Sequence, residues 1–243
     1  MNTSVQVAIV AALEREMKPA VRSWKKTVRA HDGRSFTFFE HESTVVVCGG
    51  VGAQPARRAT EAVIALYQPK LVISLGYCGA LNDTLKVGEL FIPHRIVDAR
   101  DGSSALAVQG QGTLVSFSEI ASPAQKAQLG RSYSAQAVDM EAAAVSRGAE
   151  TRNLPFLAVK AVSDVSSESL PPMASFLRPD GSMRTAAFAF FCLIRPWLWP
   201  SLFRLQQGSA RASRTLAAWI QNAAGGLKFL NNSEVALHQA SRT

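Results

Sequence analysis

The sequence has few of the residues that bind metals or form disulfides. Its 243 residues include three cysteines and four histidines, and neither type occurs at a spacing that would place several ligands around one ion. An odd number of cysteines also argues against a disulfide framework. We therefore expect Cys48, Cys78 and Cys192 to be reduced thiols in a cytoplasmic protein that holds no metal.

The sequence also has no zinc-finger, RNP or helix-turn-helix pattern, although its net charge is +8. Residues 181–243 contain seven basic residues and one acidic residue, a net excess of six. Such a basic region is typical of contact with nucleic acid or with an anionic membrane surface, and equally of a solvated face. Because no recognition motif accompanies it, we expect no nucleic-acid partner.

The N-terminal apolar run lacks the charge pattern of a signal peptide. No lysine or arginine precedes Val5 to Leu13, and Glu14 and Glu16 follow it directly. A near-continuous apolar run of this length is typical of a parallel strand that is buried on both faces. We therefore interpret it as the first strand of a sheet rather than as a targeting segment.

Predicted strands and helices alternate along the chain. Apolar runs predict buried strands at residues 71–75 and 156–162, and a hairpin made of residues 36–40 and 44–48. Shorter strands are predicted at 89–93, 96–98, 113–117 and 136–140, a loop at 101–112, and helices at 14–22, 56–67 and 141–151 and from Ser122-Pro123. This order is typical of one α/β domain with a central mixed, mostly parallel sheet flanked by helices.

Acidic and glycine-rich segments follow the predicted strands. Ligands of such sheets bind just beyond the carboxyl ends of the strands. We expect loops at those places, and their residues are Glu14 and Glu16, Gly49–Gly52, Gly76–Gly79, Met140–Glu141 and Ser163–Asp164. Cleavage of a glycosidic bond needs a proton for the leaving group, stabilisation of a cationic sugar and an activated nucleophile, and carboxylates can serve all three tasks.

Six segments that contain these residues occur in a fixed order over about residues 5 to 165. They are Val7-Ala-Ile-Val-Ala-Ala-Leu-Glu-Arg-Glu16, Cys48-Gly-Gly-Val-Gly52, Val72-Ile-Ser-Leu-Gly-Tyr-Cys-Gly-Ala-Leu81, Val87-Gly-Glu-Leu-Phe-Ile92, Val138-Asp-Met-Glu-Ala-Ala-Ala144 and Val159-Lys-Ala-Val-Ser-Asp164. Together they resemble the purine nucleoside phosphorylase / methylthioadenosine–adenosylhomocysteine nucleosidase superfamily. The resemblance implies the fold described above and action on a purine nucleoside.

The resemblance assigns a role to several positions. It implies that Asp164 protonates N7 of adenine, that Glu141 binds a ribose hydroxyl with Met140 packed against the sugar, and that Glu16 activates water. The other expected substrate-binding residues are Gly76, Tyr77, Ser163 and Lys160. Structural roles stay open for the acids: a first-turn helix acid for Glu16, an Asx-turn or cap for Asp164 and a helix start for Glu141.

The nucleophile is expected to be water rather than phosphate. Phosphorylases of this superfamily resemble Arg-Val-Gly-Ser-Cys-Gly where this chain has Ser74-Leu-Gly-Tyr-Cys-Gly79, so the phosphate-binding Arg and Ser are replaced. Glu16 would repel phosphate by about 4 kcal/mol at ~4 Å, although Arg15 and Lys160 could attract it. The segment between Ile92 and Val115 is shorter than in the typical nucleosidase, where it covers adenine or contacts a neighbouring subunit.

A dinucleotide site is not expected. Gly49-Gly-Val-Gly52 follows a predicted strand, but Pro55 stands near the place of the third glycine and no acidic residue ends a second strand about 20 residues later. We therefore expect no organic cofactor.

The C-terminal segment is strongly apolar and basic. Arg195, Pro196 and Pro200 interrupt the apolar run from Thr185 to Leu205, which makes it too broken for a spanning helix. It is interpreted either as a core or oligomer helix, or as a peripheral membrane contact through residues 185–214. This tail resembles that of the hopanoid-associated members of the superfamily, which release adenine from an adenosyl-lipid. A further helix is predicted at residues 206–222.

These patterns predict a nucleosidase-like catalytic domain at residues 1–180, an apolar and basic helical extension at 181–230 and a frayed tail at 231–243. The expected reaction is the release of adenine from a methylthioadenosine- or adenosylhomocysteine-type nucleoside, or from an adenosyl-lipid such as adenosylhopane. Two alternatives stay open: a phosphate-dependent phosphorylase, and a catalytically decayed protein that binds nucleosides or a membrane. The resemblance implies a homodimer, and the expected location is the cytoplasm, with the inner face of the membrane as a possible contact.

Overall fold

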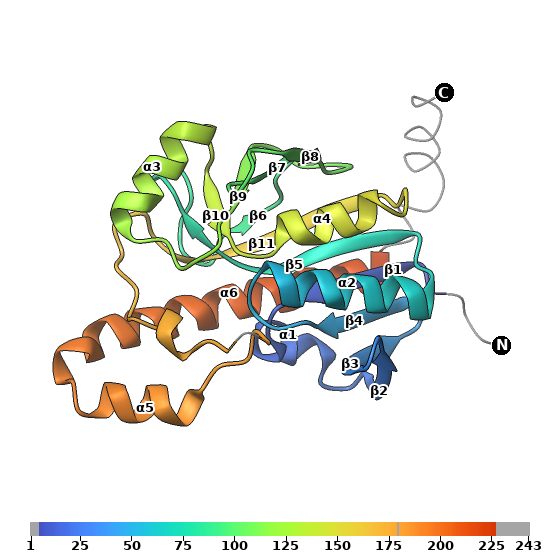
Figure 1. Cartoon of the computed structure of the whole chain (residues 1–243), viewed down its shortest axis with the longest axis horizontal. Helices are drawn as coiled ribbons and strands as arrows, with labels where there is room; N and C mark the ends of the chain where they lie inside the picture. Colours follow the sequence, from blue (N-terminus) through green and yellow to red (C-terminus); the bar gives the residue numbers. More distant parts are fainter. Residues whose placement is uncertain (1–4, 179, 227–243) are drawn as a thin grey trace.

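A central mixed sheet organises the molecule. The structure, a computed structural model, describes residues 5–178 and 180–226, and the predicted frayed tail lies outside these residues. Eleven strands form one sheet with helices on both sides (Figure 1). The strand order is β2-β3-β4-β1-β5-β10-β9-β7-β8, and β11 pairs with β5 and β6. The predicted α/β class is therefore confirmed.

The strands agree with most of the predicted runs. Their bounds are β1 Val7–Ala11, β2 Lys25–His31, β3 Arg34–His41, β4 Thr44–Cys48, β5 Leu71–Ala80, β6 Leu90–Phe91, β7 Arg95–Asp98, β8 Ser104–Leu106, β9 Thr113–Ser116, β10 Ala137–Asp139 and β11 Phe156–Asp164. β1 is buried at every position and pairs in parallel with β4 and β5, as expected of a strand covered on both faces. The β3–β4 hairpin is antiparallel, also as predicted.

Two strands were not predicted. β2 adds an antiparallel strand outside β3, and its side chains are mostly exposed, so it has no apolar alternation that would reveal it. β8 lies inside the segment that was predicted to be a loop, where it pairs with β7. Backbone hydrogen bonding to an existing strand therefore outweighs the weak local preference of both segments.

β5 and β11 extend farther than predicted. Gly76–Gly79 and Ser163–Asp164 were expected to be loops, yet both lie inside strands that pair with each other in parallel. The register places Lys160 opposite Gly76 and Asp164 opposite Gly79, with an irregularity between Val162 and Asp164. The two strands satisfy each other's backbone groups, so each continues past its apolar run into the residues of the candidate site.

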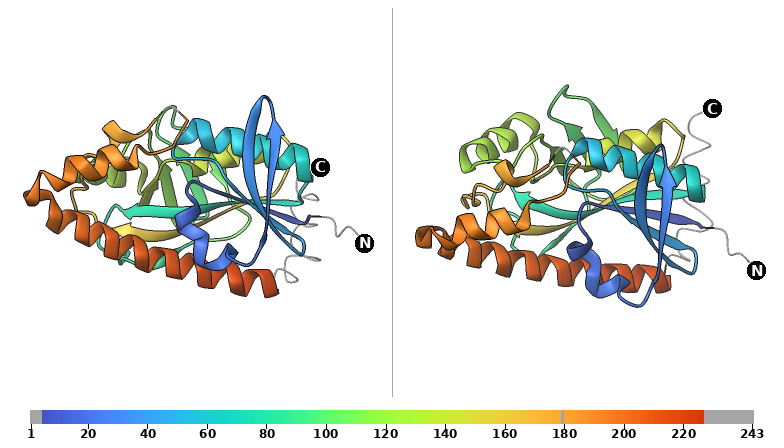
Figure 2. Two further views of the ribbon diagram at one scale, coloured as in Figure 1. Left: turned by 90° about the horizontal axis from the view of Figure 1, so that it is seen from below. Right: turned by 60° about the horizontal axis from the view of Figure 1, so that its bottom comes forward.

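Helices cover both faces of the sheet. α2 (Ala53–Tyr67) and α4 (Ala142–Glu150) pack together on one face, while α1 (Glu14–Val21) and α6 (Trp199–Gly226) pack together on the other (Figure 2). α3 (Pro123–Tyr133) packs on β9 and β10, and its capping residue is Ser122, as predicted. Ala212, Leu216, Ala217 and Ile220 of α6 belong to the same hydrophobic core as the sheet.

The chain beyond β11 forms a cover and an arm. Residues 165–184, here called the cover segment, lead to α5 (Thr185–Leu193), a 3-10 turn (Pro196–Leu198) and then α6. We call residues 185–205 the arm, because α5 and the first turns of α6 project from one end of the molecule (Figure 1). Within the described residues, no single helix is long and apolar enough to cross a membrane. Thr185–Leu193 and Pro196–Ala223 are long and apolar enough only when taken together, and the angle between these two helical segments is 108°.

Candidate active site

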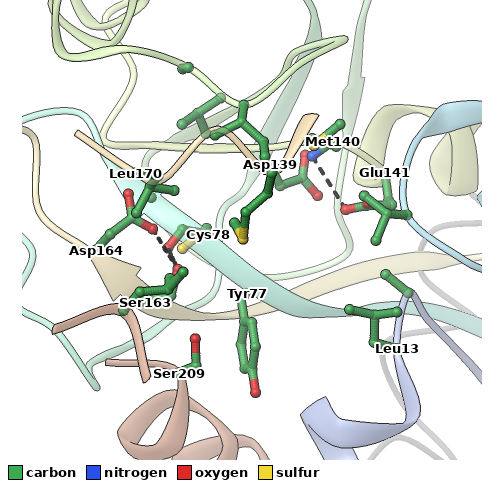
Figure 3. A pocket seen from close by; sticks show the side chains of 18 of the residues that line it. Leu13, Tyr77, Cys78, Asp139, Met140, Glu141, Ser163, Asp164, Leu170 and Ser209 are labelled. Carbon is green, nitrogen blue, oxygen red and sulfur yellow. Dashed lines mark hydrogen bonds between the residues drawn. The ribbon is translucent and has the colours of Figure 1, made fainter. Parts of the chain in front are cut away.

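A cavity lies where the carboxyl ends of β1, β10 and β11 approach the second half of β5. α3, the cover segment and α6 close it from the other sides, and Figure 3 shows many of its side chains. Its polar walls are formed by Arg15, Glu16, Tyr77, Glu119, Lys126, Asp139, Glu141, Ser163, Asp164 and Ser209. The remaining surface is mostly apolar, as is usual in small-molecule sites.

Six of the eight predicted site residues line this cavity: Glu16, Tyr77, Met140, Glu141, Ser163 and Asp164. Asp164 and Glu141 lie at opposite sides of it, and Tyr77 extends toward α6 between them (Figure 3). The other two, Gly76 and Lys160, are absent from its wall. Gly76 lies directly under the catalytic candidate Glu16, because a Cβ atom at Gly76 would be 3.1 Å from Glu16 Oε2.

Lys160 is buried beneath the cavity, which corrects its predicted place in substrate binding. Its side chain is 1% exposed, and its Nζ lies 2.8 Å from Asp139 Oδ2 and donates to Ser74 Oγ at 3.0 Å. Burial lowers the pKa of Lys160, but the negative charges of Asp139 and Glu141 outweigh this effect and raise it above its usual value. Lys160, which the sequence suggested as a possible phosphate-binding cation, is thus paired with Asp139 inside the protein.

Asp139 connects this ion pair to the start of α4. Its Oδ2 accepts a hydrogen bond from the backbone N–H of Ala142 at 2.9 Å, and its Oδ1 accepts one from Ser116 Oγ at 2.6 Å. These bonds satisfy donors at the helix N-terminus and fix the turn that carries Met140 and Glu141. Asp139 and Lys160 therefore position the sugar-binding candidates from below.

Asp164 is held by two side chains. Ser163 Oγ donates to Asp164 Oδ1 at 2.6 Å, and Lys126 Nζ lies 2.5 Å from Asp164 Oδ2. Lys126 is 1% exposed and belongs to α3. A buried cation in contact with a carboxylate stabilises its ionised form. Sequence reasoning missed Lys126, since its partner is 38 residues away and nothing in its own neighbourhood marks it as buried.

Glu141 is anchored by backbone donors. Its Oε1 accepts a hydrogen bond from the N–H of Gly52 at 2.8 Å, and its Oε2 accepts one from the N–H of Met140 at 3.3 Å. Burial and the negative charge of Asp139 raise the pKa of Glu141 to about 7. The glycine-rich segment after β4 thus orients this carboxylate rather than a nucleotide phosphate.

Glu16 is a buried carboxyl, and none of the described lysines or arginines forms an ion pair with it. Its side chain accepts a bond from the N–H of Leu13 at 3.3 Å. Burial and the negative charge of Glu141 raise its pKa to about 8. A carboxyl with a pKa near the working pH suits a general base, which must both take up and release a proton.

Tyr77 occupies the place where a phosphate-binding serine would stand in a phosphorylase. Burial and the charge of Glu16 raise the pKa of Tyr77 to about 12, so the phenol is neutral in the physiological range. Two basic residues line this cavity, Arg15 and Lys126. Arg15 is exposed, whereas Lys126 is buried. No ion pair involves the Arg15 side chain among the described residues.

Comparison with known proteins matches this architecture. The phosphorylase superfamily matches residues 6–129, just over half of the chain. The 5′-methylthioadenosine/S-adenosylhomocysteine nucleosidase of Bacillus licheniformis is 24% identical over 202 residues, which cover 68% of this chain and 87% of that protein.

Solved structures show the same fold. The Arabidopsis thaliana 5′-methylthioadenosine nucleosidase in its apo form has a TM-score of 0.71 and 19% identity, covering 97% of this chain and 99% of that one. The futalosine hydrolase of Helicobacter pylori has a TM-score of 0.70 and 15% identity, covering 93% and 99%. Together with the matched family, these similarities confirm the resemblance on which the sequence interpretation depends. The chain therefore belongs to the phosphorylase superfamily.

Proposed function

We propose that this protein hydrolyses the N-glycosidic bond of an adenine nucleoside and releases adenine. The uneven distribution of charge in the cavity carries the proposal. The two aspartates are each in contact with a buried lysine, Asp164 with Lys126 and Asp139 with Lys160. Within the described part of the chain, Glu16 and Glu141 form no ion pair with a lysine or arginine. Each aspartate carboxyl is thus in direct contact with a lysine, whereas the two glutamate carboxyls are held by backbone N–H groups.

This distribution matches the charges that develop during glycosidic cleavage. When the bond to the base breaks, the sugar becomes cationic and the base takes up the electron pair. A cationic sugar would favour the ionised forms of Glu141 and Glu16, and these carboxylates would in turn stabilise it. The leaving base would lie over the opposite side, where Asp164 delivers a proton to N7. Glu141 would accept a ribose hydroxyl, with Met140 packed against the ring.

Water is the nucleophile that the cavity favours. Glu16 can take the proton from water as it attacks the sugar. Phosphate would oppose the ionisation of Glu16 and Glu141, and Arg15 is the exposed cation on the cavity wall that could attract it. Because Lys160 is buried and paired, the phosphorylase alternative has lost one of the two cations on which it depended.

The cover segment suggests an apolar 5′ substituent on the nucleoside. The residues that it and α6 place on the cavity wall are apolar except for Ser209, namely Leu170, Met173, Leu177, Met183 and Leu205. The cover is attached to α6 by an ion pair between Glu168 Oε1 and Arg204 Nε at 3.4 Å. Such a wall suits a methylthio group or the first part of a lipid chain better than a free 5′ hydroxyl. In this proposal residues 1–180 hold the catalytic groups and the C-terminal extension shapes substrate choice.

The arm supports the lipid form of this proposal. It exposes Phe190 (65%), Leu193 (65%), Trp197 (69%), Trp199 (52%) and Phe203 (62%). Every charged residue between 181 and 226 is an arginine. Exposed aromatic side chains flanked by arginines are typical of segments that lie in the headgroup region of anionic membranes. We therefore propose peripheral membrane contact through the arm, which would bring an adenosyl-lipid to a cavity that α6 also lines.

Vesicle binding tests the membrane contact. The double variant Trp197→Ser/Phe203→Ser should bind anionic phosphatidylglycerol vesicles roughly a hundredfold or more weakly in a sedimentation assay, because each buried side chain of this type contributes about 1.5–3 kcal/mol. Val28→Ser is the matched control, since Val28 is 65% exposed on β2. Equal binding by all three proteins would refute the contact and leave the nucleosidase proposal intact.

Adenine release tests the reaction itself. Methylthioadenosine, adenosylhomocysteine and adenosine would each be assayed with and without phosphate, and an adenosyl-lipid in detergent would follow. Release in phosphate-free buffer supports a hydrolase, while release only with phosphate would identify a phosphorylase. Binding of all four without any release would support the catalytically decayed alternative. A homodimer is expected from the family resemblance and would be checked by sedimentation velocity.

A further inference from the structure

Lys126 is placed as a working part of the site rather than as a surface lysine. Three acceptors surround its Nζ: Asp164 Oδ2 at 2.5 Å, the backbone oxygen of Val165 at 2.8 Å and that of Glu168 at 3.4 Å. An ammonium group has three N–H donors, so this arrangement can use all of them. The side chain is 1% exposed and lines the same cavity as Asp164.

β5 packs closely on this ion pair. A Cβ atom added to Gly79 would lie 2.8 Å from Asp164 Oδ2 and 3.4 Å from Lys126 Cε. Glycine is therefore required at this position to let the strand approach the pair. The close packing leaves no room for solvent between β5 and this side of the ion pair.

The ion pair presents a chemical difficulty for the proposed reaction. Asp164 is expected to protonate the leaving adenine, yet its Oδ2 is the acceptor in the contact with Lys126 Nζ, so Asp164 must first receive the proton that it gives. The proton that is available lies on Lys126. As the C–N bond breaks, negative charge accumulates on the base and makes it a progressively stronger proton acceptor.

We infer that Lys126 is a positioning residue that orients Asp164 and supplies, through it, the proton taken up by the departing base. The inference rests on the proposed function. The electron pair of the C–N bond passes to the base, Lys126 Nζ gives a proton to the Asp164 carboxylate, and Asp164 passes this proton to N7. The attacking water gives hydroxide to the sugar and its other proton to Glu16. Lys126 then regains a proton from solvent, and Glu16 releases its proton to solvent.

A purely structural role for Lys126 predicts different behaviour from this relay. A structural cation would be needed equally for every substrate and could be replaced by another cation of similar reach. A proton source is needed only where the leaving group must be protonated. Arginine keeps its proton under all conditions in proteins, so it could hold Asp164 but could not supply the proton.

The test compares two leaving groups in two variants. Lys126→Gln keeps a hydrogen-bond donor but no transferable proton, and Lys126→Arg keeps the charge. Adenine release by both variants should fall by about 10²–10⁴-fold, the usual contribution of general acid catalysis. Cleavage of 4-nitrophenyl riboside should fall less than roughly tenfold, since nitrophenolate leaves without a proton. Arg131→Gln is the control, because it removes an exposed cation from the same helix.

Each outcome decides the inference. Equal losses on both substrates, or adenine release restored by Lys126→Arg, would overturn the relay and leave Lys126 as a structural cation. Wild-type protein that releases no adenine from any nucleoside would instead overturn the proposed function, and the relay with it. Melting temperatures of both variants, measured beside Arg131→Gln, show whether a loss of activity accompanies a loss of folding.

Discussion

Replacing the general-base candidate should stabilise the protein while it removes activity. Glu16 is buried, its pKa is raised from 4.5 to about 8, and its main hydrogen bond comes from the N–H of Leu13. The Glu16→Gln variant keeps an oxygen that can accept this bond but cannot become charged. Its effect on stability should therefore depend on pH, since only the wild-type residue ionises.

The magnitude follows from the difference between the folded and unfolded pKa. Because the folded pKa is raised, the folded state binds the proton more tightly, and ionisation of Glu16 opposes folding as the pH rises above 4.5. One pKa unit corresponds to about 1.4 kcal/mol. The destabilisation is then about 1 kcal/mol at pH 5, about 3 kcal/mol at pH 7 and about 5 kcal/mol at pH 9. It stops growing above the folded pKa of about 8.

Thermal unfolding at several pH values provides the assay. The advantage of Glu16→Gln over wild type should widen by about 4 kcal/mol between pH 5 and pH 9, or roughly 8–16 °C in melting temperature for a chain of this size. Glu14→Gln is the control, because Glu14 is exposed, lies in the same first turn of α1 and is 3.9 Å from Lys26 Nζ. A difference between Glu16→Gln and wild type that is constant across this range would refute the reasoning.

Three further predictions concern the same cavity. Asp164→Asn should reduce adenine release by about 10²–10⁴-fold and destabilise the fold by about 3–5 kcal/mol, since Lys126 loses its anion. Adding Lys126→Met should restore the melting temperature but not the activity; a single variant as stable as wild type would contradict this. Gly79→Ala should lower both activity and melting temperature, because its Cβ would approach Asp164 Oδ2 to 2.8 Å, whereas Gly130→Ala, with nearest contact at 3.4 Å, should not. kcat/KM for adenine release should rise with pH toward about 8 as Glu16 ionises, and a pH-independent rate below 8 would exclude Glu16 as the base.

The positions of the acids could be predicted because they depend on local pattern. Glu16, Glu141 and Asp164 each follow a buried apolar run, and parallel pairing brings the ends of such runs together. The resemblance to a known family added their roles. Even so, the prediction that Ser163 and Asp164 lie in a loop was wrong, because β11 continues through them by pairing with β5. Ser163 and Asp164 therefore reach the cavity from within a strand rather than from a loop.

The two lysines could not be assigned from sequence because burial of a charge depends on a distant partner. Lys160 was expected to face the ligand, but Asp139 and Ser74 hold it below the cavity. Lys126 lies on a helix with a cap and a proline at its start, which is ordinary for a surface helix. Its partner Asp164 lies on β11. The two residues meet because α3 packs on the same sheet, against β9 and β10.

The raised pKa of Glu16 and the instability that it causes have the same origin as its proposed role. At pH 7 a carboxyl with a pKa of about 8 is ionised in about a tenth of the molecules. Glu141 loses its proton first, with a pKa of about 7, and its charge opposes the ionisation of Glu16. A cationic sugar between them would reverse this opposition, because each carboxylate would then face a positive charge. The second negative charge is thus unfavourable in the empty cavity and favourable in the transition state, which is the difference on which catalysis depends.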